Sequence, residues 1–393
     1  MFPGPKSCLH LRLKWRRGRL RRVSQFRLKQ KAEIMTSDAY QSPALPLGGA
    51  TAWTAATLAA DKSWIVELND AERSEIRAAF YAVRGRAPYD FSQEDFPAPK
   101  LAAKLADLRN EMENGRGLAL LKNVPIEGLD DDEARVMYWG IGSQFAPAVA
   151  QNRNGDRLWS VRDEAAGANQ VHVLSDDDDG GLQPISSRAK ARSNGPLRFH
   201  TDGTDTLALL CVRPAASGGG SKLASSVTVH DEILRRRPDL HALLCQDYHR
   251  MFESNETSAG GGFYALPIFT RVGDYFSSQY SRTYVEEAQK AGAPEMSPAQ
   301  DEALDLLAEI AEETCLRFTL EKGDMFFANC HTTYHGREPF NDESTHQGTA
   351  AQDRLLLRLW FAPENSRPLA EPYANIWNTI EPGAIRSSYQ QYA

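Results

Sequence analysis

The sequence predicts a mainly β protein with flanking helices, an α+β chain whose core is a sandwich or barrel. Two observations lead to this prediction: the 393 residues contain many short β-favouring runs between turn residues, and long helical patterns are few. Such a pattern favours facing sheets over a doubly wound parallel sheet, in which strands and helices would alternate. Strands are expected at residues 117–121, 148–150, 158–161, 207–212, 223–229, 263–270, 274–279, 316–320, 325–328 and 355–361.

The clearest helix follows Asn69. This residue can cap it, Glu72 stands three residues on as in a capping box, and Ile76 and Phe80 recur at helical spacing. Another helix is expected after Asp130, where acidic residues fill the first turn and interact favourably with the helix dipole. Further helices are expected at residues 97–115, 231–237 and 298–313.

A turn signal stands at Asn154-Gly155. This dipeptide favours a tight hairpin turn, and it lies between Ala148–Ala150 and Leu158–Val161. We therefore expect these two segments to pair with each other.

The composition excludes several classes of protein. With 41% hydrophobic and 25% charged residues the chain is close to a globular average, and no run approaches the roughly 18 apolar residues of a membrane span. Cys8, Cys211, Cys245, Cys315 and Cys330 form no Cys-x-x-Cys pair, which fits neither a disulfide framework nor a zinc ribbon. We expect a protein of a reducing compartment, the cytoplasm.

Residues 1–34 form a separate basic segment. They hold eleven Lys or Arg and one acid, Glu33, whereas the rest of the chain has 34 basic and 51 acidic residues. That acidic remainder would repel a phosphate backbone, so nucleic acid is not an expected partner. The segment fits an extension upstream of a start at Met35, a basic surface-binding tail, or a transit peptide that would make the protein mitochondrial. In each case we expect it to be disordered and outside the fold.

The most informative motif is His200-Thr201-Asp202-Gly203. In an extended strand, residues i and i+2 project to the same face, so His200 and Asp202 can point at one metal ion. A further ligand must come from elsewhere, and His335 is the best candidate because it closes a strand-like run. Two histidines and one carboxylate with open positions are typical of non-haem Fe(II) oxygenases.

Two other motifs accompany this candidate metal site. Arg354 and Arg358 stand four residues apart on a hydrophobic strand, and a cation in such a run needs an anionic partner to offset its desolvation. Gly218-Gly219-Gly220-Ser221 follows a strand and offers a close backbone approach with a hydroxyl group. Both features strengthen the interpretation of His200 and Asp202 as part of a metal site.

In combination these motifs resemble the taurine dioxygenase and clavaminate synthase-like (TauD/TfdA) family of Fe(II)- and 2-oxoglutarate-dependent oxygenases. The resemblance implies a double-stranded β-helix, or jelly-roll, core over residues 117–362. Around it we expect the 1–34 extension, a lead-in with helices at 35–116 and a C-terminal tail at 363–393. The motifs that carry the resemblance, in order, are His200-Thr201-Asp202, Gly-Gly-x-Ser ending at Ser221, Gly323-Asp324-Met325, His335-Gly336-Arg337 and Arg354-x-x-x-Arg358.

The resemblance also implies roles for these residues. His200, Asp202 and His335 match the iron ligands. Arg358, deep in its hydrophobic run, matches the clamp on the distal carboxylate of 2-oxoglutarate, with Arg354 and Ser221 assisting. The implied reaction uses dioxygen, releases succinate and CO2, and oxidises an unactivated C–H bond of a small soluble molecule by hydroxylation or a related oxidation.

Two segments around these motifs limit what the resemblance implies. Residues 341–353 are expected to form an inserted polar loop, and residues 181–194 correspond to a variable loop over the substrate. The substrate and the oligomeric state therefore stay open. The alternative function is a catalytically silent small-molecule-binding protein on the same β-sandwich, although such a protein would need neither a metal triad nor a carboxylate clamp.

Other chemical hypotheses are weaker. The acidic run Asp176–Asp179 lacks the final Glu of a calcium loop, and His331 lacks the His-Glu-x-x-His context of a zinc hydrolase. The glycine run fits neither a phosphate loop nor a nucleophile elbow. Asp205 is expected to have a hydrogen-bonding role, and Trp360 to be a core residue. Surface or capping roles are expected for His172, His230, His241, His249 and His346.

Overall fold

The computed structural model describes residues 44–152, 154–162, 194–252, 262–342 and 353–389. The basic segment 1–34, the acidic run Asp176–Asp179 and most of the two expected loops at 181–194 and 341–353 lie outside these ranges. No helix in the described ranges is long and apolar enough to cross a membrane.

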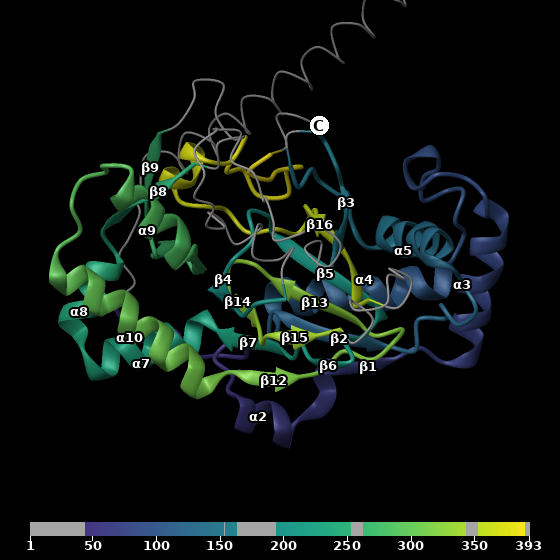
Figure 1. The fold of residues 1–393 in the computed structure, drawn as a ribbon, viewed down its shortest axis with the longest axis horizontal. Coiled ribbons are helices and arrows are strands. Elements are labelled where there is room, and N and C mark those ends of the chain that lie inside the picture. The colour runs from purple at the N-terminus through teal and green to yellow at the C-terminus, as the bar shows by residue number, and fades with distance from the viewer. Residues whose placement is uncertain (1–43, 153, 163–193, 253–261, 343–352, 390–393) are drawn as a thin grey trace, which may run out of the picture. The chain divides into compact units, whose positions relative to one another are not determined.

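Two mainly antiparallel sheets form the centre of the fold (Figure 1). The larger sheet has six strands, and its only parallel pair is β1 with β2. Its order is β1 (Ile65–Glu67), β2 (Leu118–Lys122), β13 (Met325–Asn329), β5 (Thr206–Arg213), β16 (Leu355–Phe361) and β3 (Leu158–Val161). The smaller sheet has the order β12 (Leu316–Phe318), β7 (Ser221–Ser225), β14 (Thr333–Arg337) and β4 (Leu197–His200).

Among the described residues there are also three two-stranded sheets. They are β6 (Ser217–Gly218) with β15 (Phe340–Asn341), β8 (Asp247–Met251) with β9 (Phe263–Pro267), and β10 (Phe269–Val272) with β11 (Tyr275–Ser278). The strand expected over residues 263–270 is thus divided between β9 and β10 at Ile268, whose backbone N–H donates to Leu244 instead of continuing the first pair.

Alternation along the strands divides the hydrophobic core. On β5, Ala208 and Leu210 belong to the cluster shared with the N-terminal helices, whereas Leu207 and Cys211 belong to a second cluster. That second cluster also contains Leu223 of the smaller sheet, so the two sheets face each other across it. Period-two alternation therefore gives each strand of the large sheet one face for helices and one for the interior.

Helices cover the outer faces of both sheets. The first cluster includes buried residues of α3 (Asp70–Val83), α4 (Pro99–Asn114) and α5 (Asp131–Phe145). A third cluster joins the smaller sheet to α7 (Ser226–Arg236), α8 (Pro238–Leu244) and α10 (Pro298–Thr314). The remaining elements are α2 (Ala55–Ala60), α9 (Arg282–Lys290) and the 3₁₀ turns η1 (Lys62–Trp64), η2 (Pro88–Asp90) and η6 (Glu371–Asn375).

The helix starts expected after Asn69 and Asp130 are confirmed, whereas the helix expected at 231–237 begins earlier, at Ser226. Asn69 and Glu72 form the capping box of α3, and Asp130 and Glu133 form that of α5. Each box satisfies backbone N–H groups that a helix leaves unpaired at its first turn. These local signals place the helices that brace the larger sheet.

Two local expectations are wrong. Only the first half of the strand expected at 223–229 forms, because the Ser225 hydroxyl accepts a hydrogen bond from Thr228 N at 3.0 Å and starts helix α7 at Ser226. The hairpin around Asn154-Gly155 does not pair its two arms. Instead, Val149 N donates to Trp360 at 2.9 Å, and β3 also pairs with β16.

Two histidines for which surface or capping roles were expected are buried. His230 is 0% and His241 3% exposed, and their rings meet edge to face at 4.5 Å inside the third cluster. The early start of α7 explains the error for His230, since it places this residue one turn from the buried Val227 and Ile233. His249 is half-buried, whereas His172 and His346 lie outside the described ranges.

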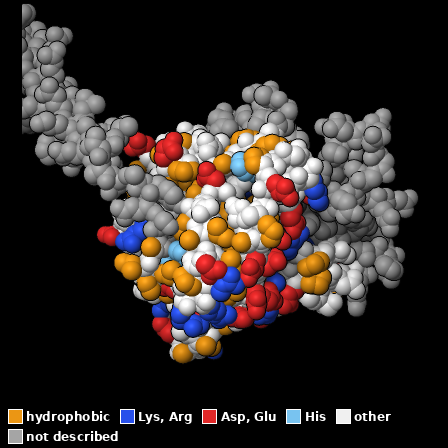
Figure 2. Space-filling model, turned by 90° about the vertical axis from the view of Figure 1, so that its left-hand side faces the viewer, with side chains coloured by type: hydrophobic (Ala, Val, Ile, Leu, Met, Phe, Trp, Pro, Cys, Tyr) orange, Lys and Arg blue, Asp and Glu red, His pale blue; other side chains and the backbone are white. Residues whose placement is uncertain are grey.

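The face that carries α8 and α9 is mixed in charge (Figure 2). Acidic and basic side chains are interspersed over it with apolar ones. Arg237, for example, pairs with Asp239 at 2.6 Å and with Glu302 of α10 at 2.6 Å. Exposed pairs of this kind contribute little to stability, so the buried clusters hold these helices in place.

Candidate active site

The strand motif brings its expected ligands together. β14 runs antiparallel to β4, and His335 lies directly opposite His200 in the register. Asp202 follows two residues after His200. The Nε2 atom of His200 is 3.8 Å from Asp202 Oδ1, and that of His335 is 3.9 Å from Oδ2. The three ligand atoms lie within 4.8 Å of one another, which is the spacing of a metal site.

The electrostatics of these three residues suit a divalent metal. Burial lowers the pKa of His200, and burial with the neighbouring imidazole lowers that of His335 to about 3. Burial alone would raise the pKa of Asp202, but Arg358 and the two histidines outweigh it and lower the pKa to about 2. The site therefore offers two neutral nitrogens and one carboxylate, a donor set that fits Fe(II) with open coordination positions.

The tautomer of His200 follows from its backbone contact. Its Nδ1 atom is 3.0 Å from the carbonyl oxygen of Arg198. A hydrogen on Nδ1 makes this contact a hydrogen bond and leaves the lone pair on Nε2, the atom that faces Asp202. The backbone of β4 thus orients the imidazole for metal binding.

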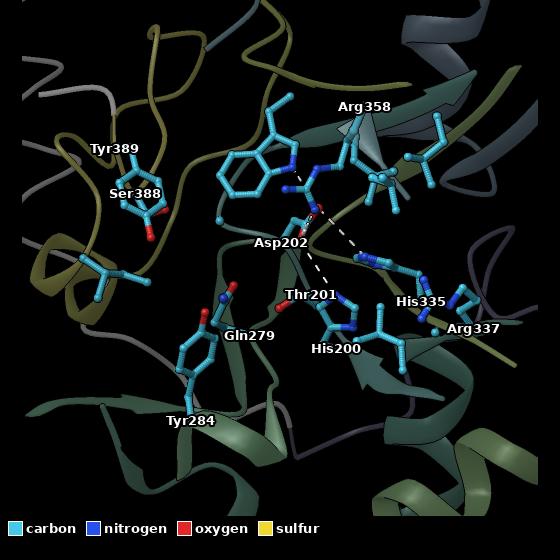
Figure 3. Close-up of a pocket in the computed structure, with 18 of the residues that line it drawn as sticks. His200, Thr201, Asp202, Gln279, Tyr284, His335, Arg337, Arg358, Ser388 and Tyr389 are labelled. Carbon is cyan, nitrogen blue, oxygen red and sulfur yellow. Dashed lines mark hydrogen bonds and ion pairs between the residues drawn. The ribbon is translucent and has the colours of Figure 1, made fainter. Parts of the chain in front are cut away.

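Asp202 is held from β16. Arg358 Nη1 lies 3.1 Å from Asp202 Oδ2, and Trp360 Nε1 donates to the same oxygen at 2.8 Å (Figure 3). Arg358 is itself fixed by Gln151, which accepts from its Nε at 2.7 Å. The guanidinium group of Arg358 is therefore already paired with protein groups.

The three candidate ligands open onto a cavity of about 410 Å³. Along β16, side chains that line the cavity alternate with side chains that pack on the helices. Arg354 and Arg358 are four residues apart and therefore both line the cavity, as expected. Trp360 lies on this face too. Trp360 is a core residue as expected, 3% exposed and part of the cluster between the sheets, and the same period of two places it beside Arg358. The cavity-lining residues of this run are Arg354, Leu356, Arg358 and Trp360.

Arg354 differs from Arg358 in its surroundings. It is 4% exposed, and its Nη1 atom has no hydrogen-bond partner among the described residues. Burial lowers its pKa to about 10. Its guanidinium group packs over the Phe340 ring at 5.0 Å, and Ser221 lines the same cavity. Gly219, with a φ of 72°, leaves room here, because a Cβ atom would come within 3.4 Å of Arg354 Nε.

Another part of the cavity wall is formed by residues that were not predicted from the sequence as site residues. In Figure 3, Gln279, Tyr284, Ser388 and Tyr389 lie on one side of Asp202, and His335 and Arg337 lie on the other. Gln279 follows β11, and the C-terminal residues of this wall follow η6. No local motif marks them. Only the folded structure indicates a binding role for this wall: two of its buried polar atoms, Gln279 Oε1 and Trp377 Nε1, have no hydrogen-bond partner among the described residues.

A buried charged cluster fixes this C-terminal part of the wall. Asp205 lies 2.8 Å from His331 Nε2 and 2.8 Å from Arg386 Nη2. The indole ring of Trp377 packs on both partners, with its centroid 5.5 Å from that of His331 and 5.6 Å from the Arg386 guanidinium. Asp205 therefore has the expected hydrogen-bonding role, and through it residues near the C-terminus are tied to the sheet.

Comparison with known proteins agrees with this geometry. Residues 82–360 match the family described as taurine catabolism dioxygenase TauD, TfdA family. The chain belongs to this family. It is therefore a non-haem iron dioxygenase that depends on 2-oxoglutarate, with Fe(II) as its metal and dioxygen as its oxidant.

Curated relatives extend over most of the chain. FR-33289 synthase of Streptomyces rubellomurinus is 30% identical over 331 residues, which cover 82% of this chain and 92% of that protein. Taurine hydroxylase-like protein SAT17 of Stachybotrys chartarum is 26% identical, covering 74% of each. A uridine-5'-phosphate dioxygenase of a Streptomyces species is 25% identical, covering 56% of this chain and 74% of that protein.

Solved structures share the fold at low sequence identity. Asparagine oxygenase in complex with Fe(II), hydroxyasparagine and succinate superposes with a TM-score of 0.55 at 15% identity, covering 76% of this chain and 93% of that one. The non-haem iron oxygenase OrfP in complex with Fe and α-ketoglutaric acid has a TM-score of 0.52 at 12% identity, with the same coverage.

Proposed function

We propose that this enzyme oxidises a C–H bond of a small polar molecule in the cavity beside His200, Asp202 and His335. The observation that carries the proposal is the metal triad in one cavity with a buried, incompletely partnered arginine, Arg354. Bound iron with 2-oxoglutarate supplies dioxygen activation, with release of succinate and CO2. The chain contributes orientation, charge and exclusion of water.

The metal would be held by His200 Nε2, His335 Nε2 and a carboxylate oxygen of Asp202. All three residues are less than 10% exposed, which limits competition from water. Their strands are hydrogen-bonded neighbours, so the two imidazoles keep their separation without help from loops. Rigid placement of this kind lowers the cost of assembling the site.

We further propose that Arg354, and not Arg358, is the main clamp for the distal carboxylate of 2-oxoglutarate, with Ser221 assisting. A buried guanidinium group with unused hydrogen-bond donors is unfavourable until an anion pairs with it. Arg354 has such a donor, whereas Arg358 is committed to Asp202 and Gln151. From the sequence, Arg358 was expected to be the main clamp because it lies deeper in the hydrophobic run, so this proposal exchanges the roles of the two arginines.

The substrate would occupy the side of the cavity formed by Gln279, Tyr284, Trp377 and Tyr389. The unpartnered amide oxygen of Gln279 accepts a hydrogen bond, and the indole N–H of Trp377 donates one. Aromatic side chains between them offer apolar contact. A molecule with an N–H or O–H donor, an oxygen acceptor and a short carbon skeleton would satisfy this wall.

We also propose that the two facing sheets constitute a double-stranded β-helix. Support comes from the core cluster between the sheets and from the position of the site, which lies where β4, β14 and β16 open onto the interior. In this arrangement the metal would sit at the mouth of the sandwich.

The experiment is a screen of succinate release. The purified chain, loaded with Fe(II), is supplied with 2-oxoglutarate and dioxygen in the presence of L-asparagine, L-arginine, taurine, uridine 5'-phosphate and a wider set of small polar molecules. We expect slow succinate release alone and faster release with the right compound, together with a product heavier by one oxygen if the reaction is a hydroxylation. Consumption of 2-oxoglutarate that does not depend on Fe(II) would contradict the proposal.

A further inference from the structure

We propose that Trp360 is a positioning residue for the metal: its indole N–H fixes the rotation of the Asp202 carboxylate and leaves Oδ1 as the ligand oxygen. The inference rests on the proposed role of Asp202 as an iron ligand. Trp360 itself would not touch the metal.

The two oxygens of Asp202 are in different surroundings. Oδ2 receives the indole N–H of Trp360 at 2.8 Å and the nearer contact with Arg358 at 3.1 Å. Each oxygen lies near one imidazole, Oδ1 at 3.8 Å from His200 Nε2 and Oδ2 at 3.9 Å from His335 Nε2, but Oδ1 has a weaker donor contact, with Arg358 at 3.5 Å, the outer limit of a hydrogen bond. Donors thus occupy one oxygen, and the other keeps its lone pairs for a metal beside the imidazole.

The indole ring is fixed in place. The guanidinium group of Arg358 lies 5.0 Å from the ring centroid, and the Tyr389 ring stacks on it at 6.3 Å with an interplanar angle of 28°. Trp360 is 3% exposed and belongs to the core cluster between the sheets. A donor with so little freedom sets the orientation of its acceptor.

Arg358 does not replace this function. Its charge stabilises the carboxylate whichever oxygen faces the guanidinium group, because Coulomb attraction depends weakly on rotation. A neutral N–H donor acts only along its own direction. Without the indole, the carboxylate could rotate and offer either oxygen, so the metal would bind a less organised site.

The test is the affinity of Trp360→Phe for Fe(II), measured anaerobically by equilibrium titration. We expect a loss of about 10–100-fold, the usual effect of removing an outer partner of a metal ligand. The matched control is Trp139→Phe, which also removes a buried indole hydrogen bond, to Phe91 O at 3.3 Å, but does not line the cavity. The control should stay within about threefold of the unaltered chain. Equal affinities for Trp360→Phe and the control would overturn the inference.

A second measurement needs no substitution at Trp360 and serves if that variant does not fold. With ¹⁵N-labelled tryptophan and Zn(II) as a diamagnetic probe, an indole N–H resonance of the unaltered chain should move when the metal binds. Metal binding without movement of any indole resonance would contradict the inference.

The two levels of the proposal fail differently. If Asp202→Ala loses Fe(II) but Trp360→Phe does not, the metal site stands and only the role of Trp360 falls. If Asp202→Ala binds Fe(II) as well as the unaltered chain, the proposed metal site itself is wrong.

Discussion

The cavity has two walls of different construction. On one, the candidate ligands and Arg354 come from strands or strand ends paired in the sheets, and their separation follows from strand register. On the other, Gln279 and Trp377 come from irregular segments, held by backbone hydrogen bonds, by the Arg250 side chain and by ring contacts. The comparison supports the proposal that metal and 2-oxoglutarate binding rest on the sheets and substrate recognition on irregular segments.

The irregular wall is nevertheless anchored. Arg386 is fully buried and donates to Asp205 and to the carbonyl oxygen of Arg367. Ser388 N donates to Gly203 O at 3.0 Å, next to Asp202. Buried charged pairs are costly to break, so the residues near the C-terminus form a defined wall of the cavity.

The largest expected effect lies on the strand wall. Asp202→Ala removes the anionic ligand and should lower the affinity for Fe(II) by more than about 100-fold, since even outer partners of ligands contribute 10–100-fold. Anaerobic titration with Fe(II) checks this, with the melting temperature as the control for folding. If a folded Asp202→Ala variant still bound Fe(II) fully, the proposed metal site on this wall would be wrong.

A smaller and more selective effect is expected on the irregular wall. Gln279→Leu removes the amide that we propose faces the substrate, and should raise the apparent Michaelis constant for the substrate by about tenfold, because a polar substrate group would lose its partner. The affinities for Fe(II) and 2-oxoglutarate should change by less than about threefold. If Gln279→Leu weakened Fe(II) binding as much as it raised the Michaelis constant for the substrate, the two walls would not have separate functions.

The smallest expected effect lies away from both walls. Burial, and then the neighbouring His230, lowers the pKa of His241 to about 4, below the value near 6.5 of an unfolded chain. The unfolded state then binds the proton more readily, so stability should fall as pH falls from about 6.5 to 4. His241→Phe should flatten this dependence by up to about 1.4 kcal/mol per pH unit. The free energy of unfolding in urea is measured for both proteins between about pH 4 and about pH 6.5. The same pH dependence in both proteins would contradict the prediction.

The strand wall was largely predictable from the sequence. The i, i+2 spacing of His200 and Asp202 and the i, i+4 spacing of the two arginines each predict a shared face, and the structure has both. What spacing could not predict is which arginine has a partner. Arg358 meets Asp202 and Gln151 only after distant segments pack, and those contacts decide the electrostatics.

The irregular wall was not predictable from local patterns. Trp377 and Tyr389 lie in a segment without periodicity, and their positions depend on the buried pair of Asp205 and Arg386, which are 181 residues apart. The burial of His230 was missed for a different reason, because Ser225 begins a helix inside a run that looks β-favouring. Long-range packing determined the position of this wall, whereas at Ser225 a local helix cap overrode the β propensity of the residues that follow.

The most direct test of the account compares the two arginines of the strand wall. The affinity for 2-oxoglutarate is measured anaerobically on the Fe(II)-loaded chain and on its Arg354→Ala and Arg358→Ala variants. Loss of a desolvated bidentate partner costs several kcal/mol, so Arg354→Ala should weaken binding by about 100-fold or more. Arg358→Ala should weaken it by less than about tenfold once metal loading is equal. The reverse ranking would contradict the assignment of Arg354 as the clamp.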